Sequence, residues 1–409
     1  MKIPRTTWPV CLSLILALLC AISLYGQSWH LTTAPATNWS SLACSADATR
    51  IFAAIYGGPI YLSSDCGTNW APTTAPVSNW QSVVSSADGT KLAAAVDGGP
   101  LYFSSDAGAT WTAAAVPPTN WFSLAGSGDG TKLYAVVGGN FGPFGGPPPG
   151  QIYISTDAGT NWNPTSASVA DWTSVSCSAD GNLVLAVAFS AVGISLSLDS
   201  GTTWISSPVP IAYLSAAACS ANGAVWAAGS ADPFHVGGGG WPVYTSSHSR
   251  PPWTATLSPG PTRPCFAASA DGSRWLVAPR GRFSLDGQGG IYTSTNSANT
   301  WFTTDSPVDF WSSVAASADG GRLFAALNGG GIYICESIVR PLLRLTLSGT
   351  NVLVSWTVPS VPITLQQNST LDAATWTDTT SLPVLNAATS RYELLLPAPL
   401  GNKFYRLKF

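Results

Sequence analysis

Charge is scarce in this chain of 409 residues: Asp, Glu, Lys and Arg make up 9% of it, and the net charge is −3. The 17 Lys and Arg residues are scattered singly, which excludes a basic patch for nucleic acid or an anionic membrane surface. Glutamate occurs twice, at Glu336 and Glu393, and histidine three times. Catalysis by paired glutamates or by a histidine triad therefore has few candidates, and no Cys/His spacing predicts a metal or cofactor site.

Long apolar runs are also missing beyond the N-terminus, and no segment keeps a 3.6-residue apolar period, so we expect no helix in the mature chain. At the start, Lys2 and Arg5 precede an apolar run over residues 10–24. This pattern predicts a signal peptide, residues 1–26, and hence a secreted protein, extracellular or periplasmic. An uncleaved N-terminal anchor is the alternative.

The chain repeats one pattern seven times, with copies starting 41 to 51 residues apart. The copies begin at Trp39, Trp80, Trp121, Trp172, Tyr213, Pro264 and Trp311. Such periods are typical of a propeller or a repeat array. Each copy divides into four short strands a to d, in the first copy residues 40–45, 51–56, 60–63 and a last strand starting at Trp70.

The chain ends predict how the ring closes. The last copy lacks strand d, whereas residues 29–35 resemble a strand d with no strands before it. The N-terminal strand should therefore complete the seventh copy. Residues 27–337 are predicted to form a seven-bladed β-propeller, and residues 338–409 a small C-terminal β-sandwich. The predicted strands of that tail are 343–347, 352–356, 363–367, 375–377, 392–396 and 404–409.

Cysteine is not arranged as a disulfide framework. Cys44, Cys177 and Cys219 occupy one repeat position where other copies have Ser, Gly or Ala. A position that accepts only small residues is a packing position, and a free thiol suits it.

A second pattern, Ser-x-Asp-x-Gly-x-x-Trp, is intact in four copies and decayed in two. Its carboxylates are Asp65, Asp106, Asp157 and Asp199. This motif resembles the Asp box, or bacterial neuraminidase repeat, of sialidase-like propellers. A structural role in hairpin turns is expected: Asp and Ser accept the N–H groups of the turn, Gly takes the positive φ, and Trp is buried. The Asp of the repeated Ser-Ala-Asp-Gly turns is expected to act likewise.

Sialidases of this resemblance use an arginine cluster, a Tyr–Glu pair and an Asp on one face, but Glu336 falls on the opposite face. The remaining acidic candidates for a glycosidase are Asp97, Asp171, Asp232, Asp286, Asp305 and Asp309. A pair of them at a suitable separation would make a glycoside hydrolase.

Three copies carry inserts between strands b and c, so all three inserts lie on one face of the predicted ring. Inserted loops on a rigid ring commonly carry function. The ligand-binding candidates from these inserts are Phe141, Phe144, Phe234, His235, Trp241, Arg280, Arg282, Phe283 and Asp286. The Trp residues that open strand a lie on the same face; either they bind ligand or they pack between neighbouring blades.

These features predict a non-catalytic, monomeric recognition scaffold for a carbohydrate or protein ligand, with no cofactor. Two alternatives stay open. One is a glycoside hydrolase that uses Asp residues of that face. The other is an assembly or adhesion factor that resembles single-propeller photosystem assembly proteins, for which Arg280 and Arg282 approximate the arginine patch.

Overall fold

The computed structural model describes residues 28–138, 149–189, 193–207, 213–230, 242–247, 252–257, 263–280, 289–337, 339, 341–370, 375–397 and 403–408. Within these ranges every named element is a β-strand, and no helix there is long and apolar enough to span a membrane. The predicted signal peptide lies outside the described residues.

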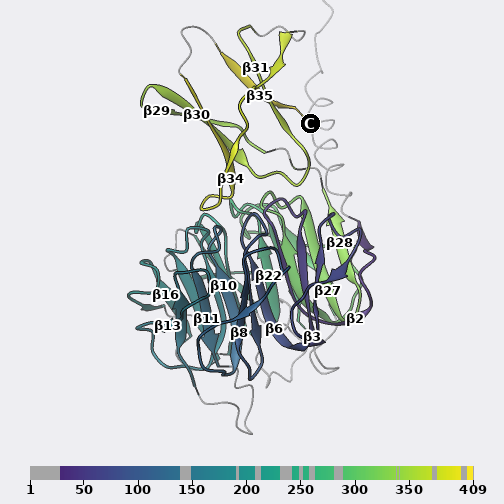
Figure 1. Ribbon diagram of the computed structural model, residues 1–409, viewed down its shortest axis with the longest axis vertical. Coiled ribbons are helices and arrows are strands. Elements are labelled where there is room, and N and C mark those ends of the chain that lie inside the picture. Colours follow the sequence, from purple (N-terminus) through teal and green to yellow (C-terminus); the bar gives the residue numbers. More distant parts are fainter. Residues whose placement is uncertain are drawn as a thin grey trace, which may run out of the picture.

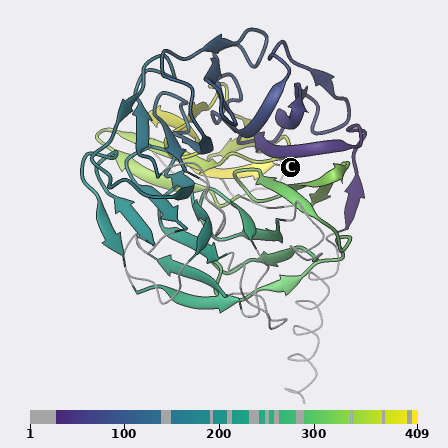
Figure 2. The ribbon, with the colours of Figure 1, turned by 90° about the horizontal axis from the view of Figure 1, so that it is seen from below.

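Most strands form a ring of four-stranded antiparallel units, with strand a nearest the centre and strand d at the rim (Figure 2). Counted over the described residues, there are seven such groups. Unit 1 is β2 (Thr37–Cys44), β3 (Ile51–Gly58), β4 (Ile60–Ser63) and β5 (Ala71–Pro72). Unit 2 is β6 (Ser78–Ser85), β7 (Leu92–Val96), β8 (Leu101–Ser104) and β9 (Thr112–Ala113). Unit 3 is β10 (Trp121–Gly126), β11 (Leu133–Val137), β12 (Ile152–Ser155) and β13 (Asn163–Pro164).

The other units repeat this order. Unit 4 is β14 (Trp172–Cys177), β15 (Val184–Ala188), β16 (Ile194–Ser197) and β17 (Ile205–Ser207). Unit 5 is β18 (Leu214–Cys219), β19 (Val225–Ser230), β20 (Val243–Ser247) and β21 (Thr254–Leu257). Unit 6 is β22 (Pro264–Ala268), β23 (Trp275–Pro279), β24 (Tyr292–Ser294) and β25 (Phe302–Thr303). Unit 7 is β26 (Trp311–Ala316), β27 (Arg322–Gly330), β28 (Ile332–Glu336) and, from the N-terminus, β1 (Trp29–Leu31).

The first strand of the described chain closes the ring, as its sequence predicts. β1 pairs antiparallel with β28, with Trp29 opposite Cys335 and Leu31 opposite Tyr333. Trp29 lies 6.4 Å from Trp311, between ring centroids, and its indole N–H donates to Thr304 of unit 6 at 3.1 Å. The N-terminal strand therefore joins unit 7 and also contacts unit 6.

Aromatic side chains fill each regular unit. In unit 1, the Trp39 ring lies 5.7 Å from Tyr61 of strand c and 6.3 Å from Trp70 before strand d. Units 2, 3 and 7 repeat the arrangement, and in unit 7 Trp29 takes the place of the strand-d tryptophan. Strand b between them is short, apolar and fully buried in units 2, 3 and 4. Large rings beside small Ala and Val side chains let neighbouring sheets pack without voids.

Two copies differ from the expected alignment. In unit 5, Leu214 pairs with Ser230 in the place where Trp172 pairs with Ala188, so the repeat begins at Leu214 and not at Tyr213. In unit 6, Pro264 takes the place of the tryptophan, and the register shift that follows the first residue of every other strand a is absent. Unit 6 therefore lacks the bulge residue, which shortens its repeat by one.

The C-terminal segment, residues 341–408, forms two further sheets at one end of the ring (Figure 1). One contains β29 (Arg344–Ser348), β30 (Asn351–Thr357), β34 (Arg391–Pro397) and β33 (Val384–Asn386). The other contains β32 (Thr377–Asp378), β31 (Thr364–Asn368) and β35 (Phe404–Lys408). Val354, Trp356, Leu365 and Leu394 form their shared core. β33 is a strand that the sequence pattern did not predict.

We predict that deleting residues 27–36 strongly destabilises or aggregates the protein, because it leaves β28 as an open edge and removes Trp29 from Trp311. The milder variant Trp29→Ala should lower the free energy of unfolding by about 2 kcal/mol or more. Denaturant melts would measure both, with Thr112→Ala on an outer strand as the control. An unchanged melt for the deletion would contradict closure through the N-terminus.

Candidate functional site

The Ser-x-Asp-x-Gly-x-x-Trp segments form tight turns between strands c and d. In the first, the Ser63 hydroxyl donates to Asp65 at 2.9 Å and accepts from the Gly67 amide at 2.8 Å. Asp65 also accepts from the backbone and side chain of Asn69 at 2.8 and 2.7 Å. The Trp70 indole donates to the Gly67 carbonyl at 3.0 Å. All these partners lie within the turn, so the motif stabilises a hairpin.

Glycine is not the single left-handed residue of these turns. The residue before it also has a positive φ, 62° at Cys66 and 59° at Ala107. The amides of these residues donate to Thr49 and Thr90 of the turn between strands a and b. The two turns of one unit are thus bonded to each other.

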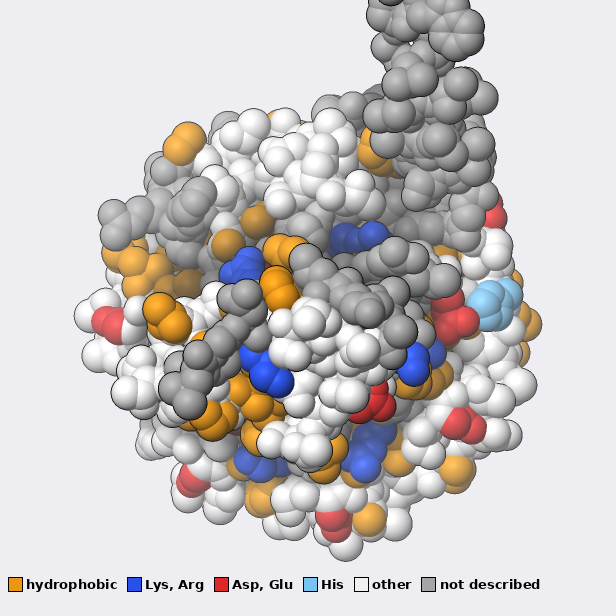
Figure 3. All heavy atoms as spheres, turned by 90° about the horizontal axis from the view of Figure 1, so that it is seen from above, with side chains coloured by type: hydrophobic (Ala, Val, Ile, Leu, Met, Phe, Trp, Pro, Cys, Tyr) orange, Lys and Arg blue, Asp and Glu red, His pale blue; other side chains and the backbone are white. Residues whose placement is uncertain are grey.

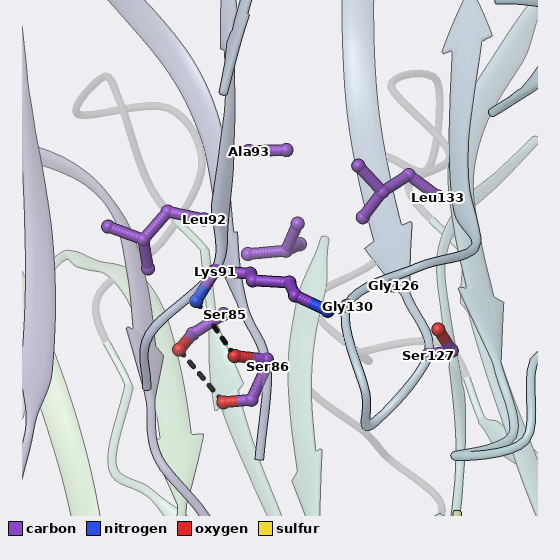
Figure 4. A pocket seen from close by; sticks show the side chains of 10 residues that line it. Ser85, Ser86, Lys91, Leu92, Ala93, Gly126, Ser127, Gly130 and Leu133 are labelled. Atoms are coloured by element: carbon purple, nitrogen blue, oxygen red, sulfur yellow. Dashed lines mark hydrogen bonds between the residues drawn. The ribbon is translucent and has the colours of Figure 1, made fainter. Parts of the chain in front are cut away.

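The turns between strands a and b carry a second structural device that the sequence analysis did not identify. A cation follows the turn in units 1, 2, 3, 6 and 7. Arg50 donates to the carbonyl of Asp88 at 3.1 Å, and Lys91 to that of Asp129 at 2.8 Å, in each case in the next unit. Figure 4 shows Lys91 beside a cavity of only about 10 Å³ between units 2 and 3. That volume fits at most one water, so this gap is a packing defect and not a ligand site.

The cysteines of the described residues are free thiols. Burial raises the pKa of the Cys44 and Cys177 thiols to about 12 and that of Cys265 to about 11. A thiol that stays protonated is unreactive. The packing interpretation of the Cys44 position agrees with this.

The tryptophans that open strand a are buried between units. Trp39, Trp80, Trp121, Trp172 and Trp311 are each at most 1% exposed. The packing interpretation of these residues is therefore confirmed, and the alternative that they bind a ligand is wrong.

A polar channel runs along the axis of the ring, with a volume of about 300 Å³. Strand a of every unit lines it. Equivalent wall positions around the ring are Ser41, Ser82, Ser123, Ser174, Ala216, Cys265 and Ser313. Five units thus have a serine at this position, whereas unit 5 has Ala216 and unit 6 has Cys265.

The channel serines cap the inner edge of the ring. The amide of Val83 donates to the Ser41 hydroxyl oxygen at 3.1 Å, and four other units repeat this contact at 2.9 to 3.3 Å. Strand a is an edge strand, so its amides would otherwise lack partners. Among the described residues, Ser41, Ser82, Ser123 and Ser313 have no acceptor for their hydroxyl hydrogens. The channel wall therefore offers O–H donors to a ligand or to water.

The predicted binding residues lie mainly outside the described residues. These are Phe141, Phe144, Phe234, His235, Trp241, Arg282, Phe283 and Asp286. The three segments concerned join β11 to β12, β19 to β20 and β23 to β24, all connections from strand b to strand c. Arg280 is described: it follows β23, lines the channel, and donates its amide to Arg263 at 2.8 Å. One candidate is thus placed on the channel wall.

The carboxylates proposed for catalysis are dispersed. Asp97 follows β7 and accepts from the Tyr56 hydroxyl at 3.1 Å. Asp171 lies between β13 and β14, Asp305 and Asp309 both lie between β25 and β26, and Asp232 and Asp286 lie outside the described residues. Over the described ranges, no cluster of three or more His, Cys, Asp or Glu side chains forms a metal site.

Both glutamates have structural partners. Glu336 forms an ion pair with Arg322 at 2.8 Å, and Glu393 accepts from Asn386 at 3.0 Å. Glu336 lies opposite Arg322, at the end of the ring where strands a and b are joined, and not at the end with the connections from strand b to strand c.

Comparison with known proteins defines the class of fold. No protein-family model matches the chain, and neither does any curated protein. Among solved structures, "YCF48 bound to D1 peptide" is similar with a TM-score of 0.54 and 15% identity, over 76% of this chain and 97% of that one. With its four-stranded sheets around a central channel, the chain has a β-propeller fold.

We predict that Ser104→Ala costs about 1–2 kcal/mol of stability, because it leaves the buried Gly108 amide without its acceptor. Asp106→Ala should also lower the melting temperature, whereas Asp106→Asn should lower it less, since Asn296 already holds the equivalent turn of unit 6. Thermal melts would compare the three variants. A loss of ligand binding in fully stable Asp106→Ala would contradict the structural role of the turn.

Acid should unfold the protein through these turns. Hydrogen bonds from Asn69 and Thr110 lower the pKa of Asp65 and Asp106. Burial opposes ionisation of Asp88 and Asp271, but hydrogen bonds within their turns outweigh it and lower the pKa of both. A lowered folded-state pKa stabilises the fold above the unfolded value of about 3.9, and this contribution is lost as pH falls through the folded value.

We therefore predict nearly constant stability from pH 7 to pH 5 and a steep loss below about pH 4. Urea melts at pH 7, 5 and 3 would measure it. Replacing Asp65, Asp106, Asp157 and Asp199 together by Asn should make the loss shallower. An equally steep loss in that variant would assign the acid dependence to other groups.

Proposed function

We propose that this chain is a secreted, non-catalytic recognition protein: a seven-bladed Asp-box propeller, residues 27–337, with a C-terminal β-sandwich, residues 338–409. It binds a carbohydrate or protein ligand at the rim where strands b and c are joined, over the mouth of the channel. The observation that carries the proposal is the channel wall, on which strand a of five units places an uncharged serine hydroxyl group.

A neutral ligand fits this surface best. Arg280 is the one charged side chain among the described residues that line the channel. Hydroxyl donors and aromatic insert residues supply hydrogen bonds and contact area and not net charge. Binding should therefore depend weakly on salt.

Between the two ligand classes, the similar structure favours a protein ligand, because it was determined with a peptide bound. The role of an assembly or adhesion factor would use the same rim, with Arg280 and Arg282 as anchors. Glycoside hydrolysis is the less supported alternative, since the described acidic candidates come from three different connections, and only Asp305 and Asp309 share one.

We predict that Trp241→Ala, or deletion of residues 141–149, weakens ligand binding about tenfold or more without unfolding the protein, as expected for a buried aromatic anchor. Peptide and glycan arrays would identify the ligand, and calorimetry would give the affinities. Thr112→Ala on the outer strand is the control.

Hydrolysis offers the opposing test. A panel of chromogenic glycosides should show no turnover. Turnover that is abolished by Asp232→Asn or Asp286→Asn would make the protein an enzyme and overturn the proposal.

A further inference from the structure

Two glycines break the repeat at positions where the backbone does not need glycine. Each turn between strands a and b begins with a serine, and in six units an alanine follows it. These alanines are Ala46, Ala87, Ala179, Ala221, Ala270 and Ala318. Unit 3 has Gly128 instead. The second exception is in unit 7, where Gly321 lies two residues after the turn residue Asp319. The equivalent residues of the other units all have side chains: Thr49, Thr90, Thr131, Asn182, Ala224 and Ser273. Neither Gly128 nor Gly321 has a positive φ. Their lack of a side chain therefore requires another reason.

The C-terminal segment occupies the space that both side chains would fill. A Cβ on Gly128 would lie 2.0 Å from the carbonyl oxygen of Ala387. A Cβ on Gly321 would lie 2.5 Å from the Ser360 hydroxyl and 3.0 Å from the Ser337 carbonyl. Real Cβ atoms do not approach a backbone oxygen as closely as at Gly128, so a side chain there would push the segment away. At Gly321, a side chain would displace the Ser360 hydroxyl from its position beside Asp319.

A buried hydrogen-bonded contact holds the same place. Asp319 Oδ2 accepts from the Ser360 amide at 2.7 Å and from its hydroxyl at 2.9 Å. Its Oδ1 accepts from Ser317 and Gly321 within its own turn. Asp319 and Ser360 are 5% and 6% exposed. One carboxylate thus joins the ring to the C-terminal segment away from water.

Apolar contacts also join the C-terminal segment to the turns between strands a and b. Val358, 2% exposed, packs with Leu385 and Tyr392 against turn alanines. Those alanines come from five of the seven units: Ala46, Ala87, Ala221, Ala270 and Ala318. Since these turns encircle the channel, side chains that touch so many of them cover its end. Figure 1 shows the C-terminal segment over this end of the ring.

We propose that the C-terminal segment is a dedicated cap for this end of the propeller, and that Gly128 and Gly321 are the residues that admit it. The capped channel is blind, so a ligand reaches it from the opposite rim alone. The docking stands on its own contacts; the direction of ligand entry rests on the proposed function.

The test restores the repeat residues in the full chain, with Gly128→Ala and Gly321→Thr, separately and together. Hydrogen exchange of the Ser360 amide and proteolysis of the connection at residues 337–343 should each accelerate tenfold or more. Gly290→Ala is the matched control, since its Cβ would meet its nearest neighbour at 3.8 Å.

If both variants fold poorly, Ser360→Ala gives the milder test, because it removes one of the two bonds to Asp319 and should raise the same exchange rate about threefold. Unchanged exchange and proteolysis in folded variants would overturn the cap. A failure to find any rim ligand would instead contradict the proposed function and leave the docking result standing.

Discussion

A closed circuit of backbone hydrogen bonds around the axis is the constraint on which the rest of the structure depends. The amide of Ala46 donates to Ala87, and the bonds continue through every unit until Ala318 donates back to Ala46, at 2.7 to 3.0 Å. Each unit must therefore place one backbone amide and one backbone carbonyl at the same level along the axis of the ring. Only small residues fit where seven turns converge, which accounts for the Ala or Gly after each turn serine. The serine hydroxyls of strand a extend this bonding to the inner edge, where five of them accept hydrogen bonds from edge-strand amides that face the channel.

Closure of this circuit also sets what the outer parts of the chain must do. Unit 7 has three strands of its own, so β1 is needed to complete it and to supply Trp29 beside Trp311. The cations after the turns join units 1, 2, 3, 6 and 7 each to the next unit, and Glu336 forms an ion pair with Arg322 in the last one. Much of the little charge in this chain thus takes part in contacts within the ring. Figure 3 shows the face with the C-terminal segment, where charged side chains are scattered among uncharged ones.

Sequence alone predicts those features that repeat with the chain. The four strands of each copy, the N-terminal closure, the turn role of Asp65 and its equivalents, and the small-residue position of Cys44 follow from local patterns repeated in register. The start of unit 5 was misplaced at Tyr213 because neither Tyr213 nor Leu214 is the tryptophan of the repeat. The role of Ser41 was missed because its partner, the Val83 amide, belongs to another unit and is exposed by a bulge. β33 lacks a repeat to reveal it, and three of its residues suffice to pair with β34.

The two ends of the channel are therefore not equivalent. At the end with the turns between strands a and b, Gly128 and Gly321 lack side chains, and the second carboxylate oxygen of Asp319 accepts a hydrogen bond from Ser360 of the C-terminal segment. At the other end, the repeat is instead lengthened by inserts in units 3, 5 and 6. The loss of side chains at Gly128 and Gly321 makes room for a fixed intramolecular partner, whereas the inserts lengthen the connections from strand b to strand c. Under the proposed function and the proposed cap, a ligand would enter from the end that carries the inserts. The hydroxyl groups on the channel wall would then favour a ligand bound through hydrogen bonds and shape over one bound through charge.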